Sequence, residues 1–251
     1  MKARAALRAE ADAAGRTRIT VLRSATPLVL RPAADAVYLA AGAGGPVGGD
    51  DLELTVDVGP GAELTVRTVG ATIALPGPGE SVLTLRLTVA AGGRLSVLPE
   101  PTIVAARARH RSRIEATVEA GGVLRVSEDV VLGRHGEVCG AYRGRLRADL
   151  AGAPLLRHEL VLDGADPVTT GRAAVTGARV CGSLLVVDPE WTPPSLAGPD
   201  AAALPLAGGG WLLTRLSAAQ DGRGTGWAGA AGWAGGPTQR ETGPVPGGDF
   251  R

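Results

Sequence analysis

The sequence predicts an all-β protein built as an irregular β-helical, solenoid-like scaffold of stacked hairpins, with few short helices. Three observations support this class. One nine-residue phrase occurs three times, apolar residues in and around each copy fall at every second position, and glycine or proline interrupts the chain at short intervals. A fixed period of about 30 residues is typical of one supersecondary unit used repeatedly, whose copies stack to bury a shared core.

The repeated phrase fits the pattern V-x-x-G-[AG]-x-L-x-V without a gap. Its copies are Val58–Val66, Val89–Val97 and Val118–Val126. In each copy the leucine and the last valine are two positions apart, and the same spacing continues upstream of the phrase. A spacing of two places these side chains on one face of a strand, so each copy is expected to carry one strand before its turn and one after it.

Glycine occupies the turn between the two strands of each copy, where a backbone of positive φ costs a glycine little. A second glycine-rich turn precedes the first copy. The glycines expected to act as turn or structural residues are Gly48, Gly49, Gly61, Gly92 and Gly121. Each unit is therefore interpreted as a β-hairpin followed by one or two connecting strands, such as Thr102–Ala105 or Ser127–Leu132.

Stacking of the units in register would align the leucines of the three copies. Leu64, Leu95 and Leu124 are then expected to form a buried ladder. A degraded fourth copy is expected at Gly152–Leu155, because Leu155 follows the third leucine at about the same period of 30 residues.

Further strands are expected around Ile19–Leu22, Val37–Ala40, Arg179–Val187 and Trp211–Leu216, each a short apolar run. Helical spacing is nearly absent apart from the stretch Ala3–Ala14. Residues 1–219 are interpreted as a single β-helical domain. Residues 220–251 consist mainly of Gly, Ala, Pro and Trp without periodicity, and they are expected to form a disordered, low-complexity tail.

Composition excludes several classes of function. The formal net charge is +1 and aromatic residues make up 3% of the chain, which argues against a nucleic-acid-binding stripe. The densest basic run, Arg107–Arg113, is favoured as the solvated face of a strand or loop over a patch for acidic surfaces. Cys139 and Cys181 are too few for a disulfide framework, and no secretory segment or membrane span is recognised, so a cytoplasmic protein is expected. Lys2 is the only lysine, so a P-loop is absent.

A weak metal site is conceivable where His135, Glu137 and Cys139 alternate along the chain. Imidazole and thiolate are suitable ligands for zinc or nickel. The glycines around them favour a loop with partly exposed polar residues instead, so no confident metal ligand and no catalytic residue is assigned.

Four carboxylates lie within or at the end of otherwise apolar strands. They are Glu100, Glu128, Asp129 and Glu137. Buried carboxylates need partners, and Arg134, Arg143 and Arg145 are near in sequence. A structural ion-pair network is the favoured interpretation, and a polar passage through the interior is the alternative.

Several segments match a known family in order and approximate spacing. Pro27-Leu28, Gly44–Asp50 (GGPVGGD), Leu98–Ala106 (LPEPTIVAA) and Leu132–Glu137 (LGRHGE) resemble the pattern of the urease accessory protein UreD family, also called UreH. The resemblance extends over about residues 17 to 188. The GGD block and the LP-x-P-x-I phrase are its most specific parts.

The resemblance implies a non-enzymatic maturation factor with an irregular β-helical fold. Such a protein binds the urease apoprotein and the accessory protein UreF, through which the GTPase UreG is recruited to deliver nickel. The GTP chemistry then belongs to a partner, which agrees with the missing P-loop. Nickel is implied to pass transiently along a polar interior route, with no tightly bound cofactor.

On this hypothesis, polar residues of the chain serve conformation, passage or partner binding. They are Asp50, Glu100, Glu128, Arg134 and Glu137. Two other interpretations remain: a carbohydrate-acting β-helix enzyme, and a purely structural solenoid with a generic binding face. The first is disfavoured because the aligned outward positions Thr65, Ser96 and Arg125 offer neither stacked acids nor aromatics.

Overall fold

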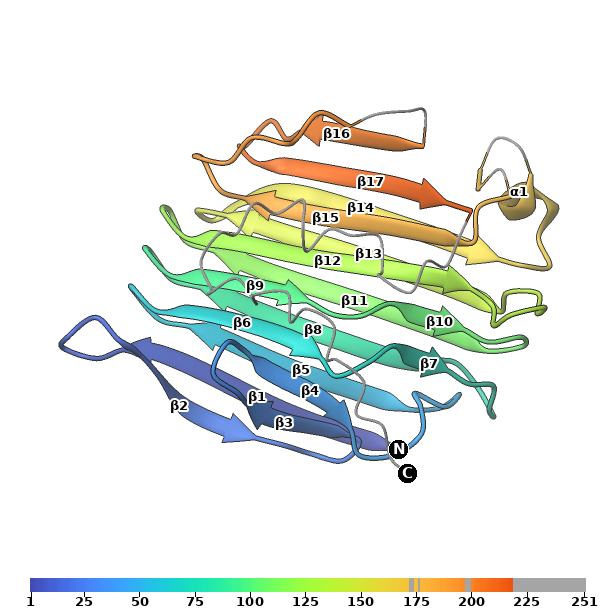
Figure 1. Cartoon of the computed structure of the whole chain (residues 1–251), viewed down its shortest axis with the longest axis horizontal. Helices are drawn as coiled ribbons and strands as arrows, with labels where there is room; N and C mark the ends of the chain where they lie inside the picture. Colours follow the sequence, from blue (N-terminus) through green and yellow to red (C-terminus); the bar gives the residue numbers. More distant parts are fainter. Residues whose placement is uncertain (172–173, 176, 197–199, 219–251) are drawn as a thin grey trace, which may run out of the picture.

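The computed structural model describes residues 1–171, 174–175, 177–196 and 200–218, which form two facing β-sheets (Figure 1). The seven strands of the first sheet are, in spatial order, β2 (Thr17–Arg23), β1 (Lys2–Ala11), β5 (Asp51–Val58), β8 (Ser81–Val89), β11 (Arg109–Val118), β13 (Ala141–Leu150) and β14 (Ala153–Asp163).

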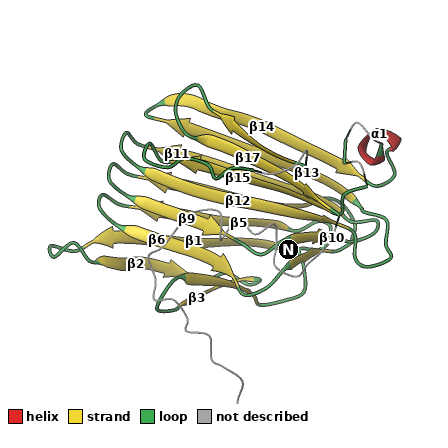
Figure 2. Ribbon diagram, turned by 45° about the horizontal axis from the view of Figure 1, so that its top comes forward, coloured by secondary structure: helices red, strands yellow, loops and turns green. Residues whose placement is uncertain are grey.

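The second sheet lies opposite the first. Its continuous path runs through β3 (Leu28–Pro32), β4 (Val37–Ala41), β6 (Glu63–Thr68), β9 (Arg94–Leu98), β12 (Val123–Leu132), β15 (Val180–Val187), β17 (Trp211–Ser217) and β16 (Ala201–Pro205). Two short strands, β7 (Thr72–Ala74) and β10 (Thr102–Val104), continue this layer, with β10 paired to both β12 and β7. Figure 2 shows the two layers, with the short helix α1 (Pro167–Thr170) at one end of the body.

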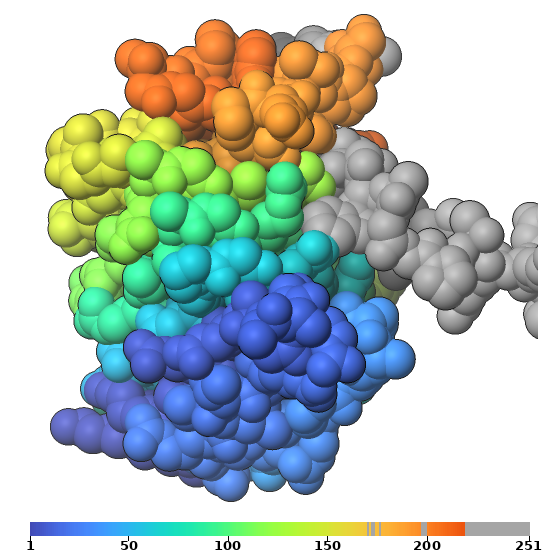
Figure 3. All heavy atoms as spheres, turned by 90° about the vertical axis from the view of Figure 1, so that its left-hand side faces the viewer, coloured from blue at the N-terminus to red at the C-terminus, as the bar shows by residue number. Residues whose placement is uncertain are grey.

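Consecutive coils stack as the repeat predicts. In the first sheet β1, β5, β8, β11 and β13 are parallel neighbours, and in the second sheet β4, β6, β9 and β12 are parallel neighbours. The colour bands of Figure 3 accordingly follow the sequence from one end of the body to the other. The expected all-β solenoid is confirmed, with roughly 4 turns.

The leucine ladder of the three copies is also confirmed. Leu64 lies opposite Leu95, and Leu95 lies opposite Leu124, on three adjacent parallel strands. Leu95 and Leu124 are 1% and 0% exposed. Parallel strands in register place equivalent residues of successive coils side by side, so one repeated phrase forms a continuous apolar row.

The two strands of each copy, however, do not pair with each other, so the expected hairpin unit is wrong in this respect. β5 ends at Val58 and β6 begins at Glu63, yet β5 belongs to the first sheet and β6 to the second. Each unit is an arch whose turn carries the chain between the sheets. Hairpin and arch share the same alternation of apolar residues, because in both cases one face of each strand is buried. The turn glycines Gly61, Gly92 and Gly121 have φ of 69°, 71° and 78°, as expected.

The fourth copy is a true hairpin and ends the stack. Ala151 and Gly152 have φ of 50° and 80°, and the flanking Leu150 and Ala153 are paired. Two successive residues of positive φ favour a tight antiparallel hairpin, so β14 folds back on β13. The fourth copy therefore adds no parallel strand to the second sheet, where antiparallel β15 follows β12 instead.

The possible helix at Ala3–Ala14 is wrong as well. This segment forms β1, in which Ala3, Ala5, Leu7 and Ala9 are buried at every second position. The helix propensity of alanine is a weak preference, and pairing with β5 buries these residues in the core. The other expected strands appear as β2, β4, β15 and β17, while 102–105 gives β10 and 127–132 is the second half of β12. The expected disordered tail, 220–251, lies outside the described residues.

In the middle coils, the space between the sheets is apolar next to the repeat turns and contains buried polar side chains toward the other ends of the strands. The inward residues of β11 illustrate this: His110 and Ser112 come first, and Ile114, Ala116 and Val118 follow. The main hydrophobic core therefore lies next to the repeat turns, and polar side chains are concentrated toward the opposite ends of the strands. Among the described residues, no helix has the length and apolar character needed to cross a membrane.

Candidate functional site

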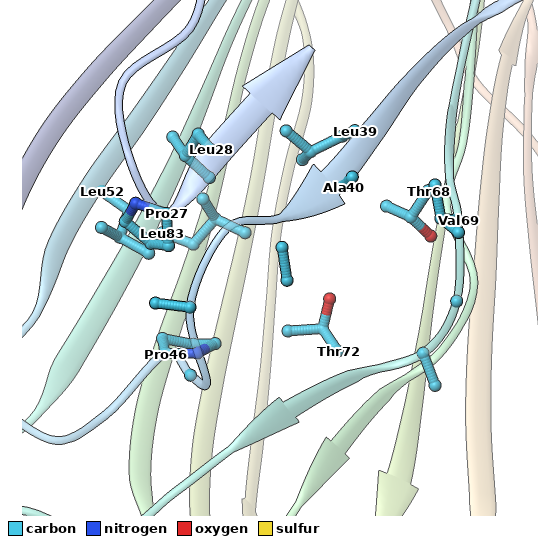
Figure 4. A pocket seen from close by; sticks show the side chains of 15 residues that line it. Pro27, Leu28, Leu39, Ala40, Pro46, Leu52, Thr68, Val69, Thr72 and Leu83 are labelled. Carbon is cyan, nitrogen blue, oxygen red and sulfur yellow. The ribbon is translucent and has the colours of Figure 1, made fainter. Parts of the chain in front are cut away.

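A cavity of about 350 Å³ opens at the end of the coils opposite the repeat turns (Figure 4). Its walls include Pro27 and Leu28 before and at the start of β3, Pro46 of the glycine-rich turn, and Val69 after β6. The lining is largely apolar, with Thr68 and Thr72 contributing hydroxyl groups. The cavity lies where the two sheets separate, because the chain between β6 and β7 is not part of a continuous strand.

Asp50 fixes the turn that forms one side of this cavity. Its Oδ2 accepts the Val47 backbone N–H at 2.8 Å, and its Oδ1 accepts the α-amino group of Met1 at 2.7 Å. Burial alone would raise the pKa of the Asp50 carboxyl, but these two donors outweigh burial and hold the pKa below its ordinary value. Asp50 is thus a conformational residue, and its carboxylate is already occupied by donors.

Gly48 and Gly49 hold the same turn against the segment before β8. A Cβ at Gly48 would lie 2.5 Å from the backbone oxygen of Gly79. This contact is a steric clash, and the backbone would have to shift to remove it. Gly49 has a φ of 94°, which favours glycine. A side chain at Gly48 would meet the neighbouring backbone, and one at Gly49 would require an unfavourable backbone conformation.

A smaller chamber of about 60 Å³ lies beside the cavity, in the space between the sheets. The two spaces share four wall residues: Leu39, Thr68, Thr72 and Leu83. The lining of the chamber is largely apolar, but it includes polar residues of β11, of β12 and of the loop after β9. They are Glu100, Ser112, Ser127, Glu128 and Asp129. The structure therefore brings three of the four carboxylates singled out from the sequence to one chamber.

Glu128 is a half-buried carboxylate of this chamber. It points inward from β12, following Leu124 and Val126 of the ladder face, and its remaining accessible surface faces the chamber. Ser112 donates its hydroxyl to Glu128 Oε1. Burial raises the pKa of Glu128, the Ser112 hydroxyl opposes this rise, and the charge of Asp129 adds to it.

Tyr142 and Gly144 of β13 complete the surroundings of Glu128, and the sequence analysis did not identify them. A Cβ at Gly144 would lie 2.7 Å from the Tyr142 hydroxyl and 2.9 Å from Glu128 Oε2, so the missing side chain leaves room for both groups. Burial raises the pKa of Tyr142 well above its ordinary value, and the neighbouring Glu128 raises it further. The Tyr142 hydroxyl nevertheless has no hydrogen bond of good geometry within the described part of the chain. The available signal was the alternation of Tyr142 and Gly144 with the outward-facing arginines of β13.

His110 and Ser81 form a second buried polar pair that the sequence analysis missed. They are opposite each other on β11 and β8, with Ser81 Oγ 2.9 Å from His110 Nδ1. The Ser81 hydroxyl donates to the Arg109 carbonyl oxygen at 3.3 Å. With its proton used in this way, the Ser81 oxygen accepts a hydrogen bond from Nδ1–H of a neutral His110 imidazole. Burial lowers the pKa of His110 to about 4, so the ring is uncharged near neutral pH.

The loop after β12 is held by an ion pair and by one arginine that sequence reasoning did not find. Arg134 Nε donates to Glu137 Oε1 at 2.9 Å, and Glu137 Oε2 accepts the Ala106 N–H at 3.2 Å. The Arg134 side chain, followed by the Ala106 N–H, lowers the pKa of Glu137 to about 2. Arg179 donates to the carbonyl oxygens of Gly133, Arg134 and Glu137. Glu137 and Arg134 thus maintain the shape of this loop.

The structure does not assemble the weak metal candidates into a ligand set. His135 is exposed, and Glu137 is engaged by Arg134. Burial raises the pKa of Cys139 to about 11, which disfavours the thiolate that binds metals. Within the described ranges, no group of three or more His, Cys, Asp or Glu side chains is arranged to hold a metal ion.

The favoured ion-pair network of the carboxylates forms only in part. Arg134 pairs with Glu137 as expected, but Arg143 and Arg145 both point to Glu159 of β14 on the outer face. Inward and outward residues alternate along β13, so the arginines at odd positions cannot reach Glu128.

Comparison with known proteins identifies the family. The sequence model of the UreD urease accessory protein family matches residues 1–240. The urease accessory protein UreD of Frankia alni is 40% identical over 264 aligned residues, covering 86% of this chain and 88% of the relative. The chain belongs to the UreD family. UreD of a Parafrankia species is 42% identical, and the alignment covers 86% of this chain and 83% of the Parafrankia protein. UreD 1 of Saccharopolyspora erythraea is 39% identical, with coverage of 87% and 89%.

Three of the four UreD-like segments reach the two adjoining spaces, whereas LGRHGE lines a different pocket through Leu132 and Glu137. The PL pair contributes Pro27 and Leu28 to the cavity, and the GGPVGGD block contributes Gly45 and Pro46. The LPEPTI phrase contributes residues 99, 100 and 102 to the inner chamber. Segments that are far apart in the sequence therefore line two neighbouring spaces of this UreD-family fold.

Proposed function

We propose that this protein is a non-enzymatic scaffold for urease maturation, which binds the urease apoprotein and the accessory protein UreF. UreG, a GTPase, is recruited through UreF and supplies the nucleotide chemistry. This division of labour is consistent with the sequence, which contains no P-loop. The proposed setting is the cytoplasm, and neither nucleic acid nor membrane is a proposed partner.

The meeting of three of the four UreD-like segments at the cavity and the adjoining chamber is the observation that supports this proposal. Turn glycines, cavity-lining prolines and the Glu100 segment come from separate parts of the chain. A generic structural solenoid would not need them at one place. A carbohydrate-acting enzyme is further disfavoured because Ser96 and Arg125 are buried, and Arg125 pairs with Asp188 at 2.9 Å.

The cavity and the inner chamber are proposed as part of a transient route for nickel, which is cargo and not a resident cofactor. The chamber offers carboxylate and hydroxyl oxygens, whereas nickel binds well to imidazole. A largely apolar chamber that offers a few oxygen ligands and no histidine favours brief residence of the ion over tight binding. Passage requires binding that is weak enough for release.

Urease activation in cells whose own UreD gene is deleted tests the proposal. The chain is expressed with urease, UreF and UreG, and urease activity, nickel content and co-purification with UreF are measured. Wild-type protein is expected to restore activity and to co-purify with UreF. Absence of both results would overturn the proposed function.

Variants of the chamber separate the route from the scaffold. Glu128→Gln is expected to lower nickel loading while leaving co-purification with UreF intact, and Glu10→Gln on the exposed face of β1 is the matched control. Asp50→Asn and Glu137→Gln are expected to lower activation through the turn and loop that they hold. Full activation by all three site variants would instead support a solenoid whose polar interior has no role.

A further inference from the structure

The outer face of the first sheet carries a dense group of arginines away from the cavity. β11 and β13 are parallel neighbours, and their register places Arg111 opposite Arg143 and Arg113 opposite Arg145. Arg109 and Arg147 extend the group along the two strands. These six residues, Arg109, Arg111, Arg113, Arg143, Arg145 and Arg147, are called the arginine grid below.

The carboxylates around the arginine grid balance only part of its charge. Glu80 pairs with Arg111 at 2.8 Å, and Glu159 is shared between Arg143 at 3.2 Å and Arg145 at 3.4 Å. The remaining three arginines of the grid form no ion pair with any described residue. Two carboxylates therefore make the ion pairs of the six guanidinium groups, because the nearby Glu115 and Asp149 pair with Arg86 and Arg157 instead.

The same sheet pairs its charges well elsewhere. On β1, β5 and β8, Arg4 contacts Asp51 and Glu53, and Arg86 contacts Glu53 and Glu115. Opposite charges thus alternate across neighbouring strands in that half of the face. In the arginine grid, like charges are directly opposite, an arrangement that destabilises a sheet. The solenoid architecture itself does not require this arrangement.

We propose that the arginine grid is a docking surface for an acidic protein segment that presents several carboxylates. A guanidinium group binds a carboxylate through two parallel hydrogen bonds, which suits recognition of Asp and Glu side chains. β11, β13 and β14 are adjacent (Figure 2), so the surface is a broad sheet face about 10 Å across the strands. This surface is separate from the cavity, and the inference does not depend on the proposed route for nickel.

The surroundings favour an acidic protein over a nucleic acid. Glu115, Asp149 and Glu159 lie on or beside the grid and would repel a continuous phosphate backbone. Tyr142, the aromatic residue of β13, is buried and points inward, so it offers no stacking platform. The chain as a whole has a net charge of only +1. Separate carboxylates of a protein segment therefore match this basic surface, which acidic residues interrupt, better than the continuous phosphate backbone of a nucleic acid does.

Fluorescence anisotropy with a labelled oligoglutamate peptide tests the inference on the full chain. Arg113→Gln/Arg145→Gln is compared with Arg23→Gln/Arg31→Gln, a control that removes the same charge from exposed strands β2 and β3. Loss of two exposed charge contacts is expected to weaken peptide binding about tenfold. The control is expected to bind like wild type, and a serine–glycine peptide is expected not to bind.

Salt and stability measurements complete the test. Binding should weaken strongly between about 0.1 M and about 1 M salt, because the Debye length falls from about 10 Å to about 3 Å. The grid variant should melt at the wild-type temperature or above it, because substitution relieves repulsion. Equal weakening by both double variants, absence of peptide binding, or tighter binding of a DNA duplex would each overturn the proposal.

Discussion

Replacing Leu95 with alanine tests the central packing element of the fold. Leu95 is 1% exposed and lies between Leu64 and Leu124 on three adjacent parallel strands. Its side chain therefore has an apolar neighbour on each side within its sheet, and it belongs to the main core between the two sheets. Truncation removes buried apolar carbon atoms at a position where backbone hydrogen bonds on both sides limit collapse.

The expected loss is about 4 kcal/mol of unfolding free energy. Removing three buried carbon atoms costs about 2 kcal/mol in transfer free energy. A residual cavity of roughly 75 Å³ would add about 2 kcal/mol if the surrounding strands do not move inward. If the surrounding strands move partly into the cavity, the loss of unfolding free energy for Leu95→Ala would decrease toward about 3 kcal/mol. Leu64→Ala should cost less than Leu95→Ala, because Leu64 is nearer the end of the ladder.

Urea denaturation followed by circular dichroism measures this loss. Leu95→Ala should lower the transition midpoint without changing the slope, since the surface exposed on unfolding stays nearly the same. Val69→Ala is the control: Val69 is 69% exposed and should change stability by at most about 0.5 kcal/mol. A loss for Leu95→Ala below about 1 kcal/mol would refute the ladder as a stabilising element.

Three further predictions concern the polar interior and the cavity turn. The pKa of His110 is lowered to about 4 from an ordinary 6.5, so between these pH values the unfolded chain binds a proton that the folded chain does not. The free energy of unfolding should therefore fall by about 3 kcal/mol as the pH decreases through this window. The fall should be smaller in His110→Gln, and measuring the unfolding free energy at a series of pH values tests this. The raised pKa of Glu128 means that ionisation opposes folding at higher pH, so Glu128→Gln should be as stable as wild type at pH 8, or more stable by about 1 kcal/mol. Gly48→Ala should lose about 2 kcal/mol in urea denaturation because its Cβ would meet the backbone of the neighbouring turn.

Matched comparisons make these results decisive. Carboxylates of the chain also titrate in acid, so the contribution of His110 is the difference in unfolding free energy between wild type and His110→Gln at each pH. If this difference did not change with pH, the lowered pKa of His110 would be contradicted. A large loss for Glu128→Gln at pH 8 would mean that the charged form is stabilised by its surroundings. Gly70→Ala is the control for Gly48→Ala, because a Cβ at Gly70 meets nothing within 4 Å, and equal effects of the two substitutions would contradict the close-approach argument.

The candidate site was predictable where its residues interrupt a pattern. Glu100 and Glu128 could be recognised as carboxylates at strand ends or within apolar strands, and the chamber contains both. Arg179 could not be recognised, because it reaches a loop more than 40 residues earlier in the chain. The burial of His110 could not be recognised because His110 lies within a run of arginines. In the strand, residues alternate between the two faces, so the imidazole is buried and the neighbouring arginines face outward.

The sequence by itself determined the strand content, the repeat and the identity of the ladder residues. Spacing of two and a period near 30 residues define which side chains align once parallel coils stack. Only the tertiary structure decided whether the strands of a unit pair with each other or cross between two sheets, because both arrangements bury the same alternating face. It also decided the chamber around Glu128 and the arginine grid, since these depend on the register between strands of different coils, which no local pattern specifies.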